Sequence, residues 1–254
     1  MKWFFWTLIF LAFFTPIIFI GKGIDHLDIM KDRYKRALDA GASSAARALI
    51  YDDKDSLEHA SIGFGTKIQN GNNISIDKEN ALNWFYRVFY RNLGIENDAD
   101  AQLKIKRYIP MKAIAGFDRL MVADLSDQWI LEKEYLIEFK GKKYYFTMSD
   151  QVREKNTNLW GRDVDFGISP SEREALISRF IRNELDLFLA SRANYESKNN
   201  YHIRIADNNV DVDSESICGI SFIVMAEGMP LPTLNPWNSE KFYAYALGGT
   251  EISR

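Results

Sequence analysis

The sequence predicts an α+β protein in which an N-terminal transmembrane helix continues into a long amphipathic helix, followed by a head domain. Two observations predict the N-terminal part: residues 3–20 carry no charge, and apolar residues recur at helical spacing over 24–50. A third predicts the head. After residue 76 a helical segment, strand-like segments, a second helical segment and further strand-like segments follow one another. This order is typical of a mainly antiparallel sheet with two packed helices.

The apolar run Trp3–Ile20 is 18 residues long. A helix of that length spans roughly 27 Å, close to the thickness of about 30 Å of a hydrocarbon core. The run is longer than the apolar region of a signal peptide, and no A-x-A cleavage pattern follows it. We therefore predict that residues 1–22 form a retained transmembrane anchor.

The next segment, residues 23–51, is predicted as an amphipathic stalk helix. Its apolar residues mostly recur every three or four positions, and Ala and Gly dominate positions 37–48. Small side chains let a helix approach another backbone closely. Two partners are compatible with this face, the protein's own head or another subunit. As an assembly interface, the candidate residues are Leu38, Gly41, Ala42, Ala45, Ala46 and Leu49.

Residues 52–254 are predicted to form the α+β head, and its first part, up to Ile76, is predicted as a loop. Asp77 is a plausible N-cap for a helix over 78–93, which Gly94 would end. Strands are expected over 113–125 and 129–147. Within the second, Lys140–Lys143 forms the Gly-containing loop of a β-hairpin.

In the second half of the head, residues 151–168 are polar without a period and are predicted as an excursion from the fold. Ser169, Pro170 and Glu172 predict a capped helix start, with the helix running to about Ala193. The remaining strand candidates are residues 201–206, 217–226 and 242–247, with a turn over 228–232.

No catalytic signature stands out. The single cysteine, Cys218, lies in an apolar run, and the three histidines, His26, His59 and His202, match no nucleophile or metal motif. The alternating acidic residues Asp207–Glu215 suggest a calcium loop, but Val212 stands where such a loop needs glycine. Asp163 and Asp165 are a carboxylate pair without a metal-binding histidine. We predict a protein that is not an enzyme and holds no cofactor or metal.

Charge limits the partners. The net charge is −3 with both signs interspersed, so no direct nucleic-acid partner is expected. A basic cluster of Lys31, Arg33, Lys35 and Arg36 follows the anchor and is interpreted as a solvated face near lipid headgroups.

A family resemblance adds to this. An apolar N-terminus that runs into an Ala-rich amphipathic helix and a mixed head resembles type IV pilins and pseudopilins. More narrowly, the runs Asp32–Ala46, Ile76–Ala81 and Phe89–Leu93 resemble membrane-anchored proteins of the tight-adherence pilus type, which are similar to proteins of Gram-positive secretion and conjugation gene clusters. The resemblance covers residues 1–95. The chain lacks the Gly-Phe peptidase site and the early Glu of type IV pilins, so it implies an accessory or minor component.

The expected function is therefore that of a single-pass, pilin-like component of a bacterial surface appendage or of a secretion or conjugation machine. Its expected partners are the lipid bilayer and other envelope, pilus or secretion proteins, or further copies of itself. The resemblance places the head outside the cell membrane, although the lysines and arginines after the anchor favour the inside. Two alternatives stay open: an anchored ligand-binding or sensor module, and an anchored enzyme with a site that is not visible in the sequence.

Overall fold

The computed structural model describes residues 27–49, 66–69, 73–192, 219–231 and 241–249. These residues form four α-helices together with antiparallel sheets, which confirms the predicted α+β class. In this part of the chain no helix is both long and apolar enough to cross a membrane. The predicted anchor, residues 1–22, lies outside the described residues, as do the first and last residues of the predicted stalk.

The first described element is a helix over residues 27–49, here called the N-terminal helix. The others are, in order, β1 (Thr66–Gln69), β2 (Asn73–Ile76), α2 (Lys78–Leu93), α3 (Ala99–Lys106), β3 (Met111–Ala115), β4 (Arg119–Ala123), β5 (Trp129–Glu134), β6 (Leu136–Phe139), β7 (Lys142–Phe146), β8 (Gln151–Glu154), β9 (Trp160–Arg162), the 3₁₀ turn η2 (Asp163–Phe166), α4 (Pro170–Arg192), β10 (Ser221–Pro230) and β11 (Lys241–Gly249).

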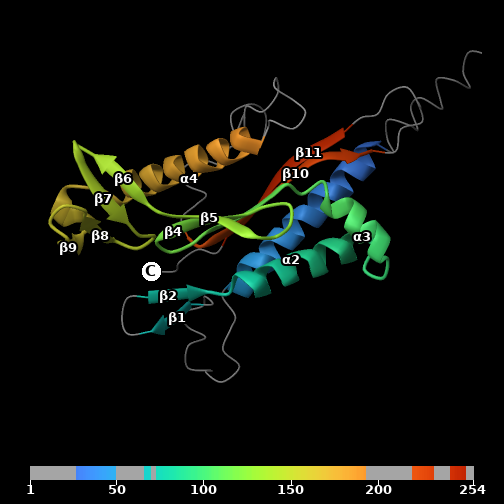
Figure 1. The fold of residues 1–254 in the computed structure, drawn as a ribbon, viewed down its shortest axis with the longest axis horizontal. Coiled ribbons are helices and arrows are strands. Elements are labelled where there is room, and N and C mark those ends of the chain that lie inside the picture. The colour runs from blue at the N-terminus through green and yellow to red at the C-terminus, as the bar shows by residue number, and fades with distance from the viewer. Residues whose placement is uncertain (1–26, 50–65, 70–72, 193–218, 232–240, 250–254) are drawn as a thin grey trace, which may run out of the picture.

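The described strands form a five-stranded sheet in the order β11-β10-β3-β4-β5, a four-stranded sheet in the order β6-β7-β8-β9, and the β1-β2 hairpin. Successive residues of the five-stranded sheet face opposite sides. Ile114, Phe222 and Val224 join the core beneath the N-terminal helix and α2. Ala113 and Ile223 join a second core with α4 and the four-stranded sheet. Figure 1 shows α4 apart from the N-terminal helix and α2, which lie together near β10 and β11.

Both predicted head helices are confirmed with their caps. Asp77 accepts a hydrogen bond from the Asn80 amide at 2.9 Å, and Gly94 ends α2 in the left-handed conformation with φ 69°. At α4, the Glu172 amide donates to Ser169 Oγ at 3.2 Å, and the Ser169 amide donates to Glu172 Oε2 at 2.9 Å. This reciprocal pair is a capping box.

The strand predictions are partly confirmed. The hairpin of β6 and β7 turns at Lys140 and Gly141, which both have positive φ, and β11 covers the predicted residues 242–247. The single strand predicted over 113–125 is wrong. Residues 111–123 form the hairpin β3-β4, and the Gly116 amide donates to Arg119 O at 2.8 Å across the turn. A Cβ at Gly116 would lie 2.8 Å from the Ile76 side chain and 3.0 Å from Arg119 O.

Three further predictions need correction. The segment 151–168 contains β8, β9 and η2, which are too short for a period to show in the sequence. Residues 228–230 of the predicted turn belong to β10, which continues to Pro230 through an irregularity near Gly228, where φ is 68°. The hairpin β1-β2 lies within the segment predicted as a loop, and α3 was not predicted at all. The candidate strand at 201–206 lies outside the described residues.

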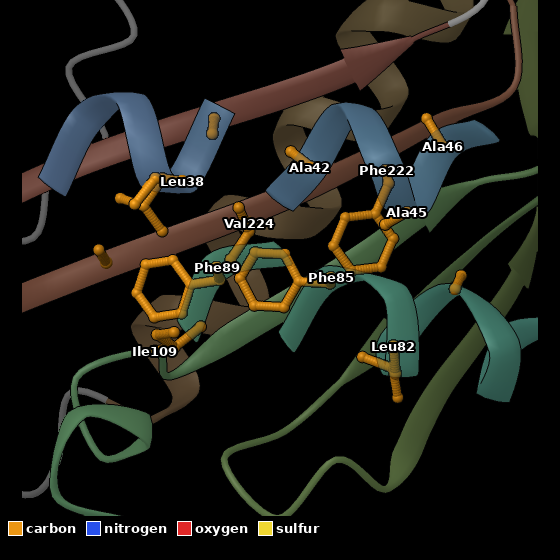
Figure 2. Close-up of a cluster of buried hydrophobic side chains, with 14 of the residues drawn as sticks. Leu38, Ala42, Ala45, Ala46, Leu82, Phe85, Phe89, Ile109, Phe222 and Val224 are labelled. Atoms are coloured by element: carbon orange, nitrogen blue, oxygen red, sulfur yellow. The ribbon is translucent and has the colours of Figure 1, made fainter. Parts of the chain in front are cut away.

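The small residues of the N-terminal helix let it lie against the sheet. A Cβ at Gly248 of β11 would lie 2.0 Å from the carbonyl oxygen of Ala42, so only glycine fits at this contact. A Cβ at Gly41 would lie 2.9 Å from the ring of Phe85 in α2. Figure 2 shows Phe85 and Phe89 between the N-terminal helix and the sheet. The helix is therefore part of the core of the head.

We expect Gly248→Ala to lower the free energy of unfolding by about 3 kcal/mol, the upper part of the range for overpacking, because the new methyl group meets helix backbone. Gly41→Ala should cost less. There the neighbour is partly a side-chain ring, and alanine gains about 1 kcal/mol in helix propensity. Chemical unfolding of both variants measures the difference. Equal stability of wild type and Gly248→Ala would contradict the close contact.

Candidate functional site

The residues predicted as an assembly interface are buried within this chain. Leu38, Ala42 and Ala45 have no exposed surface, Ala46 and Leu49 are 1% exposed, and Gly41 faces Phe85. Figure 2 shows four of them against the side chains of α2 and β10. In this arrangement the face is occupied by the head itself, which is one of the two partners the sequence left open. Contact with a second molecule stays a prediction and would need the helix to leave this position.

The basic cluster on the N-terminal helix is largely engaged in contacts within the chain. Arg33 Nη2 donates to Leu93 O at 2.8 Å and so satisfies a terminal carbonyl of α2. Lys35 pairs with Asp39 at 3.1 Å and donates to Tyr245 O of β11 at 3.3 Å. Arg36 lies 3.7 Å from Asp32 on an exposed surface. The contacts of Arg33 and Lys35 with backbone carbonyls hold the helix against α2 and β11, whereas the two ion pairs lie within the helix.

The core contains a buried charged group, Lys112 on β3, whose side chain is fully buried. Its Nζ donates to Asp127 Oδ1 at 2.6 Å, and Tyr86 Oη donates to the same oxygen at 2.8 Å. Lys106 pairs with the other carboxylate oxygen, Oδ2. Asp127 sits in the turn between β4 and β5 with φ 63°, so the network ties this turn to α2 and α3.

This network changes the pKa values of Asp127, Lys112 and Tyr86. Burial opposes the charge on Asp127, but hydrogen bonds from Lys106 and Lys112 hold its pKa below the usual 3.8. Burial lowers the pKa of Lys112, and Asp127 opposes that shift. Burial and the charge of Asp127 raise the pKa of Tyr86 far above its usual range. The carboxylate thus stays ionised and neutralises cations in the core, which is a structural role.

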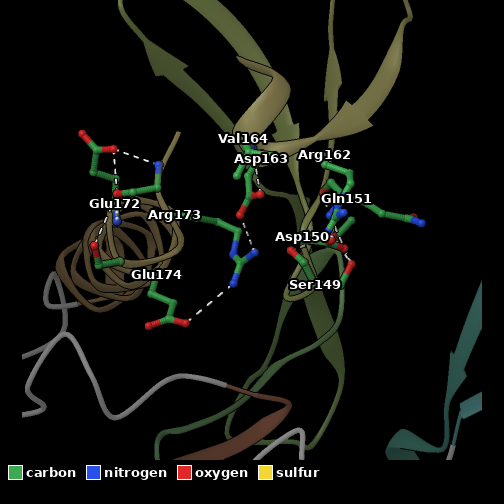
Figure 3. A network of polar contacts seen from close by, with 12 residues as sticks. Ser149, Asp150, Gln151, Arg162, Asp163, Val164, Glu172, Arg173 and Glu174 are labelled. Carbon is green, nitrogen blue, oxygen red and sulfur yellow. Dashed lines mark hydrogen bonds and ion pairs between the residues drawn. The ribbon is translucent and has the colours of Figure 1, made fainter. Parts of the chain in front are cut away.

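The carboxylate pair noted in the sequence is also structural. Asp163 accepts a hydrogen bond from Arg173 Nη1 at 2.8 Å, and both side chains are buried. Figure 3 shows this ion pair joining η2 to the first turns of α4. Asp165 accepts from the Arg162 amide at 2.9 Å, and Arg162 Nε donates to Asp150 at 2.8 Å. The two aspartates therefore bind different partners and share no site.

The structure gathers aromatic and cationic side chains on the outer face of the four-stranded sheet. Tyr145, Arg153 and Trp160 are direct neighbours on β7, β8 and β9. The Arg153 guanidinium carbon lies 4.4 Å from the Tyr145 ring centre and 5.2 Å from that of Trp160. Stacking of this kind fixes the orientation of the half-exposed Trp160. Sequence reasoning missed the group because β8 and β9 were not predicted.

Two open hollows lie at the end of the molecule that is opposite the four-stranded sheet. One, of 370 Å³, is lined by Arg87, Tyr90, Arg91, Glu96, Asn97 and Gln102 of α2, α3 and their connection. The other, of 290 Å³, lies between the N-terminal helix and α2 and is lined by Ile29, Asp32, Arg33, Arg36, Ala37 and Asn92. Both are bordered mainly by charged and polar side chains at the surface.

The remaining sequence candidates lie outside the described residues: Cys218, the three histidines and the acidic run 207–215. Within the described ranges, no group of three His, Cys, Asp or Glu side chains could hold a metal ion. Comparisons of the chain with protein-family models, curated proteins and solved structures find no match.

Asp127→Asn should lower the free energy of unfolding at pH 7 by about 3 kcal/mol, because it leaves the charge of Lys112 buried without a counterion. Because the pKa of Asp127 is lowered by folding, its contribution is present above the usual value of 3.8 and is lost as pH falls below it. Unfolding measured at pH 7 and pH 3 should therefore show the two proteins converging in acid.

Lys112→Met is the matched control, since it removes the buried charge and keeps an apolar stem. It should cost less than Asp127→Asn. A larger loss for Lys112→Met, or a difference that grows in acid, would contradict the proposed role of Asp127.

Proposed function

We propose that the chain is a non-enzymatic, single-pass, membrane-anchored and pilin-like accessory component of a bacterial surface appendage or of a secretion or conjugation machine. The observation that carries the proposal joins sequence and structure. The apolar run Trp3–Ile20 comes a few residues before a helix that is packed into the core of an antiparallel α+β head. An anchor that continues into this helix would hold the head at a fixed orientation to the membrane.

The described residues support the proposal that this helix transmits force from the anchor to the head. Its polar side chains bind backbone carbonyls of α2 and β11, and its small side chains contact sheet and helix directly. Because the N-terminal helix is extensively buried in the head, a force that pulls on this helix would be transmitted to the whole five-stranded sheet. The head is proposed to lie outside the cell membrane and to meet other envelope proteins through its exposed surfaces.

The ligand-binding alternative has less support. Ligand pockets are usually concave and mainly apolar with a few polar groups, whereas both hollows are open and bordered by charges. A thermal-shift screen of the full chain with sugars, peptides and cations would favour this alternative if one ligand raised the melting temperature.

Carbonate extraction of cell membranes tests the anchor. We expect wild type to stay in the membrane pellet, and Leu11→Arg with Phe14→Arg to release most of the protein, because each central arginine costs about 3 kcal/mol. Ile29→Arg, at a position that is 63% exposed on the N-terminal helix, is the matched control and should change nothing.

Protease added to intact cells then tests the side of the membrane, and cross-linking in cells tests assembly. We expect the head to be digested and the chain to appear in a higher-mass complex. A wild-type protein that carbonate releases, or that is strictly monomeric after cross-linking, would contradict the proposal.

A further inference from the structure

One end of the four-stranded sheet brings the turn between β6 and β7 beside the connection between β8 and β9. The Lys155 amide donates to Lys143 O at 2.9 Å, and the Glu154 amide donates to Leu159 O at 3.1 Å. We call this end the sheet tip, which consists of Lys140, Lys142, Lys143, Lys155, Leu159 and Trp160. Figure 1 shows this sheet and α3 at opposite ends of the molecule.

The sheet tip exposes large apolar side chains. Leu159 is 60% exposed and Trp160 is 50% exposed, and Val164 in the neighbouring η2 is 59% exposed. Leu159 and Trp160 are consecutive, so two large apolar side chains are exposed at the sheet tip itself, whereas Val164 follows the other end of β9. Contiguous exposed apolar surface marks a contact site. Arg153 holds the indole of Trp160 from one side, so the ring is positioned before any partner arrives.

Cations surround these side chains. All four lysines of the sheet tip are exposed. The neighbouring acids are Glu154, which pairs with Lys142 at 3.0 Å, Glu138, which stands opposite Lys143 in the strand register, and Glu172, whose carboxylate interacts electrostatically with Lys140. The four lysines outnumber these three carboxylates, so the sheet tip attracts an anionic surface.

We propose that the sheet tip binds an anionic lipid surface, with Leu159 and Trp160 entering the headgroup region and the lysines lying over the lipid phosphates. Trp is favoured at the membrane–water interface, and each lysine near an anionic bilayer adds binding energy. We choose a lipid surface over a protein because the sheet tip combines exposed apolar side chains with exposed lysines, and neither of the two hollows described above, which could receive side chains of a protein partner, is lined by its residues.

The inference does not depend on the proposed anchor. If the anchor is present, however, the chain has two lipid contacts, the anchor and the sheet tip. It would then link the membrane that holds residues 1–22 to a second anionic surface.

The test uses the full chain held in nanodiscs of phosphatidylcholine and floated with vesicles of phosphatidylcholine and phosphatidylglycerol in equal parts. We expect wild type to float with the anionic vesicles, to stay behind with pure phosphatidylcholine vesicles, and to be released by salt. Lys143→Glu with Lys155→Glu should weaken binding roughly tenfold or more. Leu159→Ser should weaken it roughly tenfold, and it leaves the stack of Arg153 and Trp160 in place.

The matched control is Leu103→Ser with Lys104→Glu in α3, where the leucine is 62% exposed and the lysine is also exposed. This variant should float like wild type, and unchanged melting temperatures should show that all variants fold. Equal flotation of wild type and the sheet-tip variants, or binding indifferent to lipid charge, would overturn the proposal. So would a sheet-tip variant that instead loses self-association in mass photometry, since the occupant would then be a second copy.

Failure of the anchor is distinguishable from failure of the sheet tip. A chain without an anchor does not enter the nanodiscs and can be floated directly with the same vesicles, with the same expected differences between variants.

Discussion

The structure depends on one close contact, between the backbone of the N-terminal helix at Ala42 and β11 at Gly248. No side-chain atom fits between them, because a single Cβ at Gly248 would overlap the helix carbonyl. This contact lets Leu38, Ala45 and Leu49 reach the core, where Phe85 and Phe89 of α2 fill the space above β10. Without it, one face of the five-stranded sheet would lose the cover that the N-terminal helix provides.

Two buried ion pairs stabilise the fold in addition to its apolar packing. Lys112 and Asp127 join the turn after β4 to the helices on one face of the sheet, and Asp163 and Arg173 join η2 to α4 on the other. Each pair neutralises a charge that would otherwise be costly to bury. Both ion pairs lie at turns of the chain, and each holds its turn in place more firmly than apolar contacts alone would. The exposed groups, among them the sheet tip, are therefore attached to a well-fixed core.

The sequence was most informative where the signal is local. The caps at Asp77 and Ser169 and the turn at Gly141 depend on residues three or four positions apart, and the structure has them as predicted. The prediction over 113–125 was wrong because Phe117, an apolar residue packed against both cores, occupies the β3-β4 turn and hides it. The group of Tyr145, Arg153 and Trp160 is brought together by the pairing of three short strands, and the spacing of these residues along the chain does not specify that pairing.

The small-residue stripe shows the same limit of local signals. Its composition predicted a close backbone neighbour, and the structure supplies one in Gly248, a residue 206 positions further on than Ala42. No pattern within the helix could choose between this partner and another subunit. Consequently the N-terminal helix is an integral element of the head, and an anchor attached to it would carry the head with it.

Hydrogen–deuterium exchange of the full chain tests this central claim most directly. If the N-terminal helix belongs to the core, amides from Ala37 to Leu49 should exchange about as slowly as those of β10, since both would open only with the whole fold. Exchange of these amides at the rate of an exposed helix, with β10 still protected, would show that the helix is separate from the head and would contradict the account.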